Sequence, residues 1–227
     1  MGFYDNYNFE GLKFFSRIEN YPTVSNPCNE FLSVINYLKT TSRNITVAEI
    51  GVGFGATTLQ ILKLLDANDT YYCFDFEDKL KDMTEDLQAR DFGIKCQVIA
   101  AGNSHDEWDS YNWHLSNMIF RMRERRESGI FDAVHLDGAH TFLHDGLAVC
   151  LLKELIKVDG FLILDDLFWN FASSEWGRSI GPGRLTERQM KDMQVLRVQE
   201  LFLTNDPNFE RLSAPKDYRG IFRKRRK

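Results

Sequence analysis

The chain has 227 residues, 43% of them hydrophobic and 13% aromatic, so it is long and apolar enough to bury the core of one large domain. Its formal net charge of -5 argues against a general affinity for nucleic acids. No run of about 18 apolar residues is present and residues 1–10 hold no apolar signal core, so we expect neither a membrane span nor secretion.

Short apolar runs alternate with amphipathic segments along most of the chain, which predicts strands that alternate with helices. The predicted strands are 45–50, 71–74, 95–101, 131–136 and 161–164, and the predicted helices are 56–65, 79–89, 109–127, 142–157 and 186–201. Parallel strands need a crossover connection, so this order predicts an α/β fold with a parallel sheet covered on both faces. Two final runs, 209–214 and 218–222, are separated by only three residues, which predicts an antiparallel hairpin.

Two aromatic segments lie outside the predicted sheet. The first belongs to a predicted N-terminal helical cap, 1–44, ahead of a main domain, 45–227, within one structural unit; its aromatic residues are Phe3, Tyr4, Tyr7, Phe9, Phe14 and Phe15. The second segment, 167–184, follows the fifth strand and holds Trp169, Phe171, Trp176, Arg178 and Arg184. Such a loop could close over a substrate and exclude water, and the alternative is an ordinary connection whose aromatics cover the sheet.

The predicted strands of the sheet all end in polar or glycine-rich tips. These tips are 49–55, Asp75, 102–104, 137–140 and 165–166. In an open parallel sheet, the carboxyl ends of the strands form the edge at which ligands bind. Loops are commonly polar, but the coincidence of such tips at one edge predicts a binding site there.

The first tip reads Glu-Ile-Gly-Val-Gly-Phe-Gly, and its glycines, Gly51, Gly53 and Gly55, allow a sharp turn and a close approach to a ligand. Asp75 lies 20 residues after Gly55, so the spacing also fits a dinucleotide site and leaves NAD binding open. Glu49 favours a ligand that carries a cation over one that carries a pyrophosphate. Asp75 is suited to accept hydrogen bonds from ribose hydroxyls in either case.

In these motifs the chain resembles the class I S-adenosylmethionine-dependent methyltransferases over residues 27–224. The segment 49–55 resembles the first motif of the family, Asp75 resembles its ribose-binding acid, and 102–104 stands where the family often has Gly-Asp-Ser. The resemblance implies S-adenosylmethionine as cofactor and a Rossmann-like, doubly wound, seven-stranded and mostly parallel sheet that ends in an antiparallel hairpin. The cofactor-binding residues that it implies are Glu49, Gly51, Gly53, Gly55, Asp75, Asn103, Ser104 and Asp137.

The segments 131–140 and 162–166 are similar to a bacterial small-molecule O-methyltransferase branch that often carries a divalent metal. This second resemblance implies that Asp137, Asp165 and Asp166 supply oxygen ligands, which suit Mg²⁺. A cation held there would orient the acceptor and stabilise a developing alkoxide. The plainer alternative is that these carboxylates cap turns.

The candidate catalytic residues are His140 and Asp137. His140 is the expected general base, because an ordinary histidine pKa of about 6.5 suits proton transfer at neutral pH. Ala139 stands where the branch often has a second acid, so any role of that acid is absent here or has moved to His140. His140 and His144 share a helical spacing, but no third ligand in that segment supports a zinc site. His135 lies inside an apolar strand and is expected to be a core residue rather than a ligand.

The sequence therefore predicts an S-adenosylmethionine-dependent methyltransferase that methylates a hydroxyl of a small molecule, such as a sugar or a natural-product intermediate, with the help of a divalent metal. The alternatives are an NAD-dependent oxidoreductase and a catalytically inactive, methyltransferase-like partner subunit. The four cysteines form no CxxC pair, which is typical of reduced thiols in a cytoplasmic protein. The expected partner is a small-molecule methyl acceptor, without nucleic acid or membrane, and a homo-oligomer is compatible with the sequence. The basic tail, 223–227, is expected to be solvated.

Overall fold

The computed structural model describes residues 7–21, 26–42, 44–106 and 108–225, so Phe3, Tyr4 and the last two residues of the basic tail lie outside the described residues. The strands are β1 (Thr46–Ile50), β2 (Thr70–Phe76), β3 (Gln97–Asn103), β4 (Phe131–Leu136), β5 (Ile156–Leu164), β6 (Phe209–Arg211) and β7 (Gly220–Lys224). The helices are α1 (Ser16–Asn20), α2 (Asn29–Thr41), α3 (Ala56–Leu64), α4 (Glu77–Ala89), α5 (Tyr111–Glu124), α6 (Phe142–Leu155), the short η1 (Phe171–Ser173), α7 (Glu175–Ile180), α8 (Glu187–Lys191) and α9 (Gln194–Phe202). Within the described ranges, no helix is long and apolar enough to cross a membrane.

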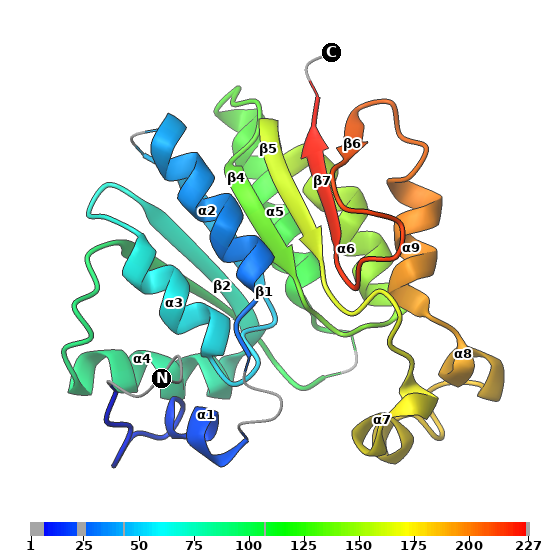
Figure 1. The fold of residues 1–227 in the computed structure, drawn as a ribbon, viewed down its shortest axis with the longest axis horizontal. Coiled ribbons are helices and arrows are strands. Elements are labelled where there is room, and N and C mark those ends of the chain that lie inside the picture. The colour runs from blue at the N-terminus through cyan, green and yellow to red at the C-terminus, as the bar shows by residue number, and fades with distance from the viewer. Residues whose placement is uncertain (1–6, 22–25, 43, 107, 226–227) are drawn as a thin grey trace.

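The seven strands form one sheet in the order β3-β2-β1-β4-β5-β7-β6 (Figure 1). The pairs among β1 to β5 are parallel, whereas β7 runs antiparallel to both β5 and β6. The predicted doubly wound sheet with its C-terminal hairpin is therefore confirmed. Because β1 and β4 are neighbours, the tips that follow them meet at the point where the strand order reverses, which is where open α/β sheets bind ligands.

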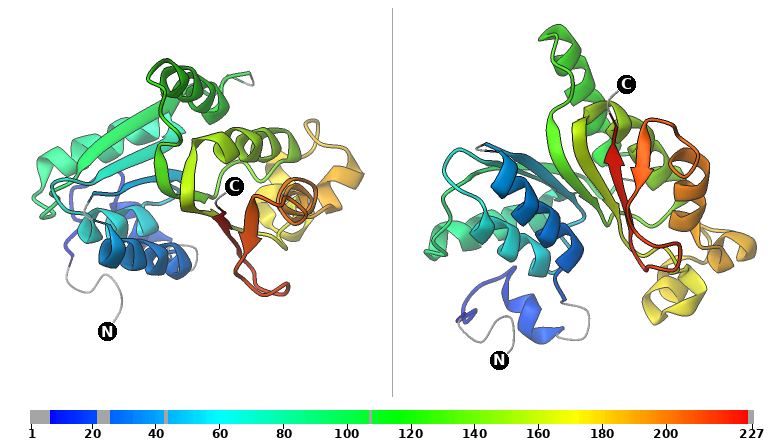
Figure 2. Two further views of the ribbon diagram at one scale, coloured as in Figure 1. Left: turned by 90° about the horizontal axis from the view of Figure 1, so that it is seen from above. Right: turned by 45° about the horizontal axis from the view of Figure 1, so that its top comes forward.

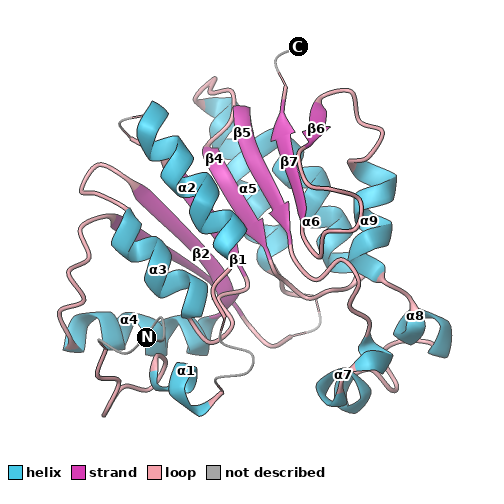
Figure 3. Ribbon diagram, viewed as in Figure 1, coloured by secondary structure: helices cyan, strands magenta, loops and turns pink. Residues whose placement is uncertain are grey.

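Helices cover both faces of the sheet (Figures 2 and 3). Side chains alternate between the two faces of a strand, and β1 shows this clearly. Val47 belongs to the core shared with α2, α3 and α4, whereas Ala48 belongs to the core shared with α5, α6 and α9. The same alternation directs Glu49 into the layer of α3, where it meets Thr58.

The helix predicted over 186–201 is broken into α8 and α9, so its predicted continuity was wrong. A capping box between Thr186 and Gln189 starts α8, and extended backbone at Asp192 ends it. The buried Gln194 then fixes the start of α9, since its side chain accepts from the Phe142 backbone N–H at 2.7 Å and donates to the Gln189 carbonyl at 3.0 Å. At this break, the Gln194 side chain therefore connects the start of α9 to the start of α6.

The N-terminal aromatic segment packs into the same core as the sheet. Phe14 and Phe15 are fully buried and belong to the core that holds α2 and α3. The buried carboxylate of Asp86 in α4 accepts the backbone N–H groups of Lys13, Phe14 and Phe15 at 2.9, 2.7 and 3.0 Å. One carboxylate thus satisfies three consecutive donors, two of which would otherwise be buried without partners.

We expect Asp86→Asn to lower the free energy of unfolding by about 1–3 kcal/mol, because an amide nitrogen would face backbone donors that need an acceptor. Urea denaturation followed by circular dichroism measures this loss. The matched control is Asp82→Asn on the same helix, whose carboxylate pairs with Arg17 at 3.5 Å near the surface. The control should change stability by about 0.5 kcal/mol or less. Equal losses in the two variants would contradict this role of Asp86.

Candidate active site

The glycine loop after β1 lies directly against the tip of β4. Gly51 has a φ of +86°, in the left-handed region that favours glycine. A Cβ atom at Gly51 would lie 1.9 Å from the main-chain oxygen of Asp137, so no larger residue fits. At Gly55, where φ is +88°, a Cβ would lie 2.5 Å from the Phe14 ring. The loop is therefore enclosed between the β4 tip and the N-terminal segment.

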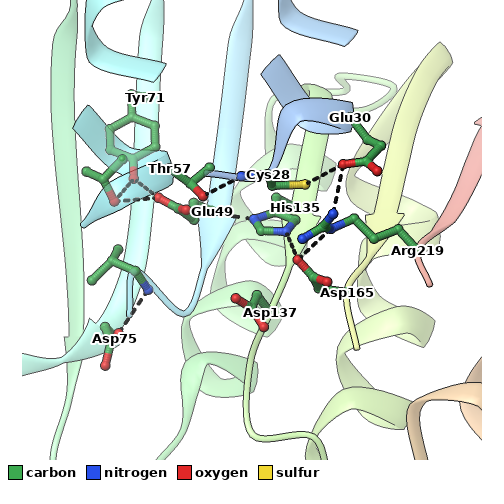
Figure 4. Close-up of polar contacts among 12 residues, drawn as sticks. Cys28, Glu30, Glu49, Thr57, Tyr71, Asp75, His135, Asp137, Asp165 and Arg219 are labelled. Carbon is green, nitrogen blue, oxygen red and sulfur yellow. Dashed lines mark hydrogen bonds and ion pairs between the residues drawn. The ribbon is translucent and has the colours of Figure 1, made fainter. Parts of the chain in front are cut away.

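Asp75 braces the glycine loop from the tip of β2. Its Oδ2 accepts the Val52 backbone N–H at 2.9 Å (Figure 4). Lys79 forms an ion pair with its carboxylate at 2.9 Å. Asp75 thus lies beside the loop, where its predicted ribose contact would place it. That contact itself stays a prediction.

Asn103 and Ser104 line an open cleft of about 370 Å³ at the tips of β2 and β3, together with Glu77, Asp78, Lys81 and His105. The ring of Phe76 stacks on His105 with centroids 4.1 Å apart. Polar atoms beside stacked rings are suited to a heteroaromatic base. The predicted cofactor contact of Asn103 and Ser104 is consistent with this position and stays a prediction.

Glu49, which was predicted to contact the cofactor, has protein partners on both of its oxygens. It is buried, and its Oε2 accepts from the Thr58 hydroxyl at 2.7 Å and from the Tyr71 hydroxyl at 2.5 Å. Its Oε1 lies 3.7 Å from Nδ1 of His135. The reason is the alternation within β1, which turns Glu49 toward α3 rather than beyond the end of the strand.

A second group of side chains gathers at the tips of β4 and β5, and we call Asp137, His140 and Asp166 the reaction cluster. Nε2 of His140 lies 3.6 Å from Oδ1 of Asp137 and 3.6 Å from Oδ2 of Asp166. One ligand atom from each residue lies within 4.8 Å of the other two, so the group could hold a metal ion. His140 and Asp166 have φ values of +54° and +56°, which are uncommon for residues with a side chain. Strain of this kind often accompanies function.

Burial and nearby charges shift the pKa values of Asp137 and His140 in the reaction cluster. Loss of hydration raises the pKa of Asp137, and the negative charge of Asp165 raises it further. Loss of hydration opposes protonation of His140, but the surrounding carboxylates, Asp137 first, outweigh it and raise the pKa of His140. His140 therefore retains its proton at neutral pH more readily than an ordinary histidine does.

Asp165, which was predicted as a metal ligand, forms hydrogen bonds to protein groups. Its Oδ2 accepts from Nε2 of His135 at 3.1 Å and from Nε of Arg219 at 2.9 Å (Figure 4). Its Oδ1 accepts the backbone N–H of Asp166 at 2.8 Å. Desolvation opposes ionisation of Asp165, but His135 and Arg219 overcome it and lower its pKa. Asp165 thus has protein partners on both oxygens, while His140 lies beside Asp137 and Asp166.

His135 lies in the core, as expected, between charged neighbours. Its ring stacks against Phe31, and its two nitrogens face Asp165 and Glu49. Burial opposes protonation of His135, but the adjacent Cys28 and these carboxylates raise its pKa well above the ordinary value.

Two residues of the site, Tyr218 and Arg219, were not identified from the sequence. Arg219 contacts both Asp165 and Glu30, the latter through Nη1 at 2.9 Å. The carbonyl of Tyr218 accepts the Leu167 backbone N–H at 3.1 Å. The signal available in the sequence was topological, because a final strand antiparallel to β5 must begin near the carboxyl end of β5.

The aromatic segment after β5 borders the reaction cluster. The Trp169 ring lies 5.2 Å from the His140 ring, 4.7 Å from Phe171 and 5.9 Å from Trp176. Trp176 is 55% exposed, so part of this aromatic group is accessible to a ligand. Closure over a substrate stays a prediction.

A family model described as a methyltransferase domain matches residues 48–167, which is more than half of the chain. No curated protein sequence matches the chain. A Staphylococcus aureus structure assigned as a caffeoyl-CoA O-methyltransferase has 15% identity and a TM-score of 0.59, and the alignment covers 93% of this chain and 92% of that one. At such identity the likeness shows a shared fold.

Two further structures have the same fold. MycE, a methyltransferase of the mycinamycin biosynthetic pathway solved with Mg, SAH and mycinamycin VI, has 18% identity and a TM-score of 0.53, with 95% of this chain and 56% of MycE covered. The SAH-bound methyltransferase PaMTH1 of Podospora anserina has 16% identity and a TM-score of 0.51, with 86% and 76% covered.

The family match spans the glycine loop, the β2 tip and the whole reaction cluster. It confirms the predicted class of enzyme and leaves the NAD-dependent alternative without support. The chain belongs to the methyltransferase-domain family.

Proposed function

We propose that the protein transfers a methyl group from S-adenosylmethionine to a hydroxyl of a small molecule, assisted by a divalent cation. The observation that carries this proposal is the contact between Gly51 and the main chain of Asp137, which places the glycine loop next to the reaction cluster. Mg and SAH, with which MycE was solved, support the same pair of ligands here.

The donor set of the reaction cluster fits a hard divalent cation. Mg²⁺ commonly binds one or two carboxylates and keeps several waters, and Asp137 and Asp166 supply two carboxylates close together. We assign Asp165 a supporting role in this proposal, because its oxygens accept hydrogen bonds from His135, Arg219 and the Asp166 backbone. When bound, a cation would supply electrostatic stabilisation for an acceptor oxygen that loses its proton.

The remaining catalytic roles are assigned to His140 of the reaction cluster and to two nearby tryptophans. His140 is the proposed general base, because its imidazole lies between the two carboxylates. The carboxylates that raise the pKa of His140 would be neutralised by a cation, which links the availability of the base to cation binding. Trp169 and Trp176 would pack against the acceptor and exclude water.

Binding calorimetry with S-adenosylhomocysteine tests this function. We expect saturable binding, and addition of Mg²⁺ should produce a second binding event that Asp166→Asn weakens. NADH should give no heat. Heat with NADH and none with S-adenosylhomocysteine would contradict the proposal. Cofactor binding without methyl transfer to a panel of hydroxylated probes would favour the inactive partner subunit.

A further inference from the structure

Two consecutive residues directly before β7, Tyr218 and Arg219, contact the segment that follows β5. Arg219 donates from Nε to Asp165, and the Tyr218 carbonyl accepts from the Leu167 backbone N–H. Burial raises the pKa of the Tyr218 hydroxyl, and the negative charge of the nearby Asp166 raises it further. The two residues on either side of Asp166 are therefore both held by the hairpin, and we call Tyr218 and Arg219 the hairpin clamp.

Arg219 is itself anchored at its other end. Its Nη1 lies 2.9 Å from Oε2 of Glu30 in the first turn of α2, and the Sγ of Cys28 lies 3.9 Å from the same oxygen (Figure 4). A guanidinium that bridges two carboxylates uses its planar fork, which an ammonium cannot reproduce. The position of Arg219 is thus set by α2 as well as by β5.

Arg219 influences the backbone of Asp166 through its contact with Asp165. Arg219 and His135 hold Oδ2 of Asp165, which leaves Oδ1 to accept the backbone N–H of Asp166. Asp166 adopts a φ of +56°, a conformation that needs support from its surroundings. This backbone conformation directs the Asp166 carboxylate toward His140.

We propose that Tyr218 and Arg219 are positioning residues of the active site, which hold Asp166 in the geometry that the reaction cluster needs. This inference rests on the proposed function, because it assigns the hairpin clamp a role at the proposed cation site. Groups that orient the ligands of a metal commonly contribute about 10–100-fold to its affinity.

The structure offers a matched comparison four residues further along the chain. Arg223 lies in β7, which directly follows Arg219, and forms an ion pair of the same length, 2.9 Å, with Asp159. It pairs with Phe161 rather than with the end of β5, so it is remote from the reaction cluster. A change at Arg223 therefore removes an arginine and an ion pair from β7 without touching the hairpin clamp.

The experiment measures Mn²⁺ affinity by the paramagnetic resonance of free Mn²⁺, and S-adenosylhomocysteine affinity by calorimetry, in the full-length protein. Arg219→Gln should weaken Mn²⁺ binding about 10–100-fold, whereas Arg223→Gln should leave it within about twofold of wild type. Arg219→Lys should stay closer to Arg219→Gln than to wild type, since charge without the fork does not bridge Asp165 and Glu30. S-adenosylhomocysteine affinity should change little in all three variants.

Tyr218→Phe keeps the ring and removes only the hydroxyl, so it carries the test if Arg219→Gln does not fold. It should also weaken Mn²⁺ binding, with an unchanged urea midpoint. Equal Mn²⁺ affinities in Arg219→Gln, Tyr218→Phe and Arg223→Gln would overturn the inference, and so would full recovery in Arg219→Lys. A wild-type protein that binds neither Mn²⁺ nor S-adenosylhomocysteine would instead overturn the proposed function.

Discussion

Asp137→Asn is expected to weaken Mn²⁺ binding at least about 100-fold and to abolish methyl transfer, which is the largest effect of any single change at the reaction cluster. The amide keeps the size of the side chain but removes a negative charge and one strong oxygen ligand. The loss of Mn²⁺ affinity should therefore be at least as large as the largest losses caused by changes in groups that only orient the ligands of a metal, about 100-fold. Loss of the charge would also remove the main influence that raises the pKa of His140.

The same titration of Mn²⁺ measures this effect, and calorimetry with S-adenosylhomocysteine reports separately on the cofactor site. Asp132→Asn is the matched control, since Asp132 lies at the opposite end of β4 and pairs with Lys157 at 2.7 Å. Mn²⁺ affinity should be unchanged in that control. Wild-type Mn²⁺ affinity in Asp137→Asn would show that the cation, if bound, is held elsewhere.

The sheet and the location of the site could be predicted because both depend on local patterns. Buried parallel strands appear as short apolar runs, and their carboxyl ends must meet at one edge. Asp137 and the glycine loop therefore came together as expected. The broken helix at Asp192 could not be predicted in the same way, because the buried side chain of Gln194 sets it by contacts with α6 and α8.

The roles of individual carboxylates were harder to predict. Glu49 precedes the last residue of its strand, so alternation turns it into the helical layer although it stands next to the glycines. Asp165 and Asp166 are adjacent in sequence and chemically identical. What separates them is the left-handed backbone of Asp166 and the contact of Asp165 with Arg219, 54 residues further along the chain. Such tertiary partners leave no local signal in the sequence.

A substitution in the glycine loop is expected to have the second large effect, on both stability and cofactor binding. We expect Gly51→Ala to lower the free energy of unfolding by about 3–5 kcal/mol, because left-handed strain and steric overlap add. The new Cβ would lie 1.9 Å from the Asp137 carbonyl oxygen, which belongs to the backbone and cannot rotate away. The tips of β1 and β4 would therefore have to separate.

Gly53→Ala divides this effect into its two causes. Gly53 also has a positive φ, +54°, but a Cβ there would meet nothing within 4 Å. The free energy of unfolding of Gly53→Ala should therefore fall only by the cost of left-handed strain, about 1–2 kcal/mol, as measured by urea denaturation. S-adenosylhomocysteine affinity should fall in Gly51→Ala by more than in Gly53→Ala, since only the former moves the β4 tip. Similar losses in both variants would mean that backbone strain alone, and not the contact with Asp137, makes glycine necessary at position 51.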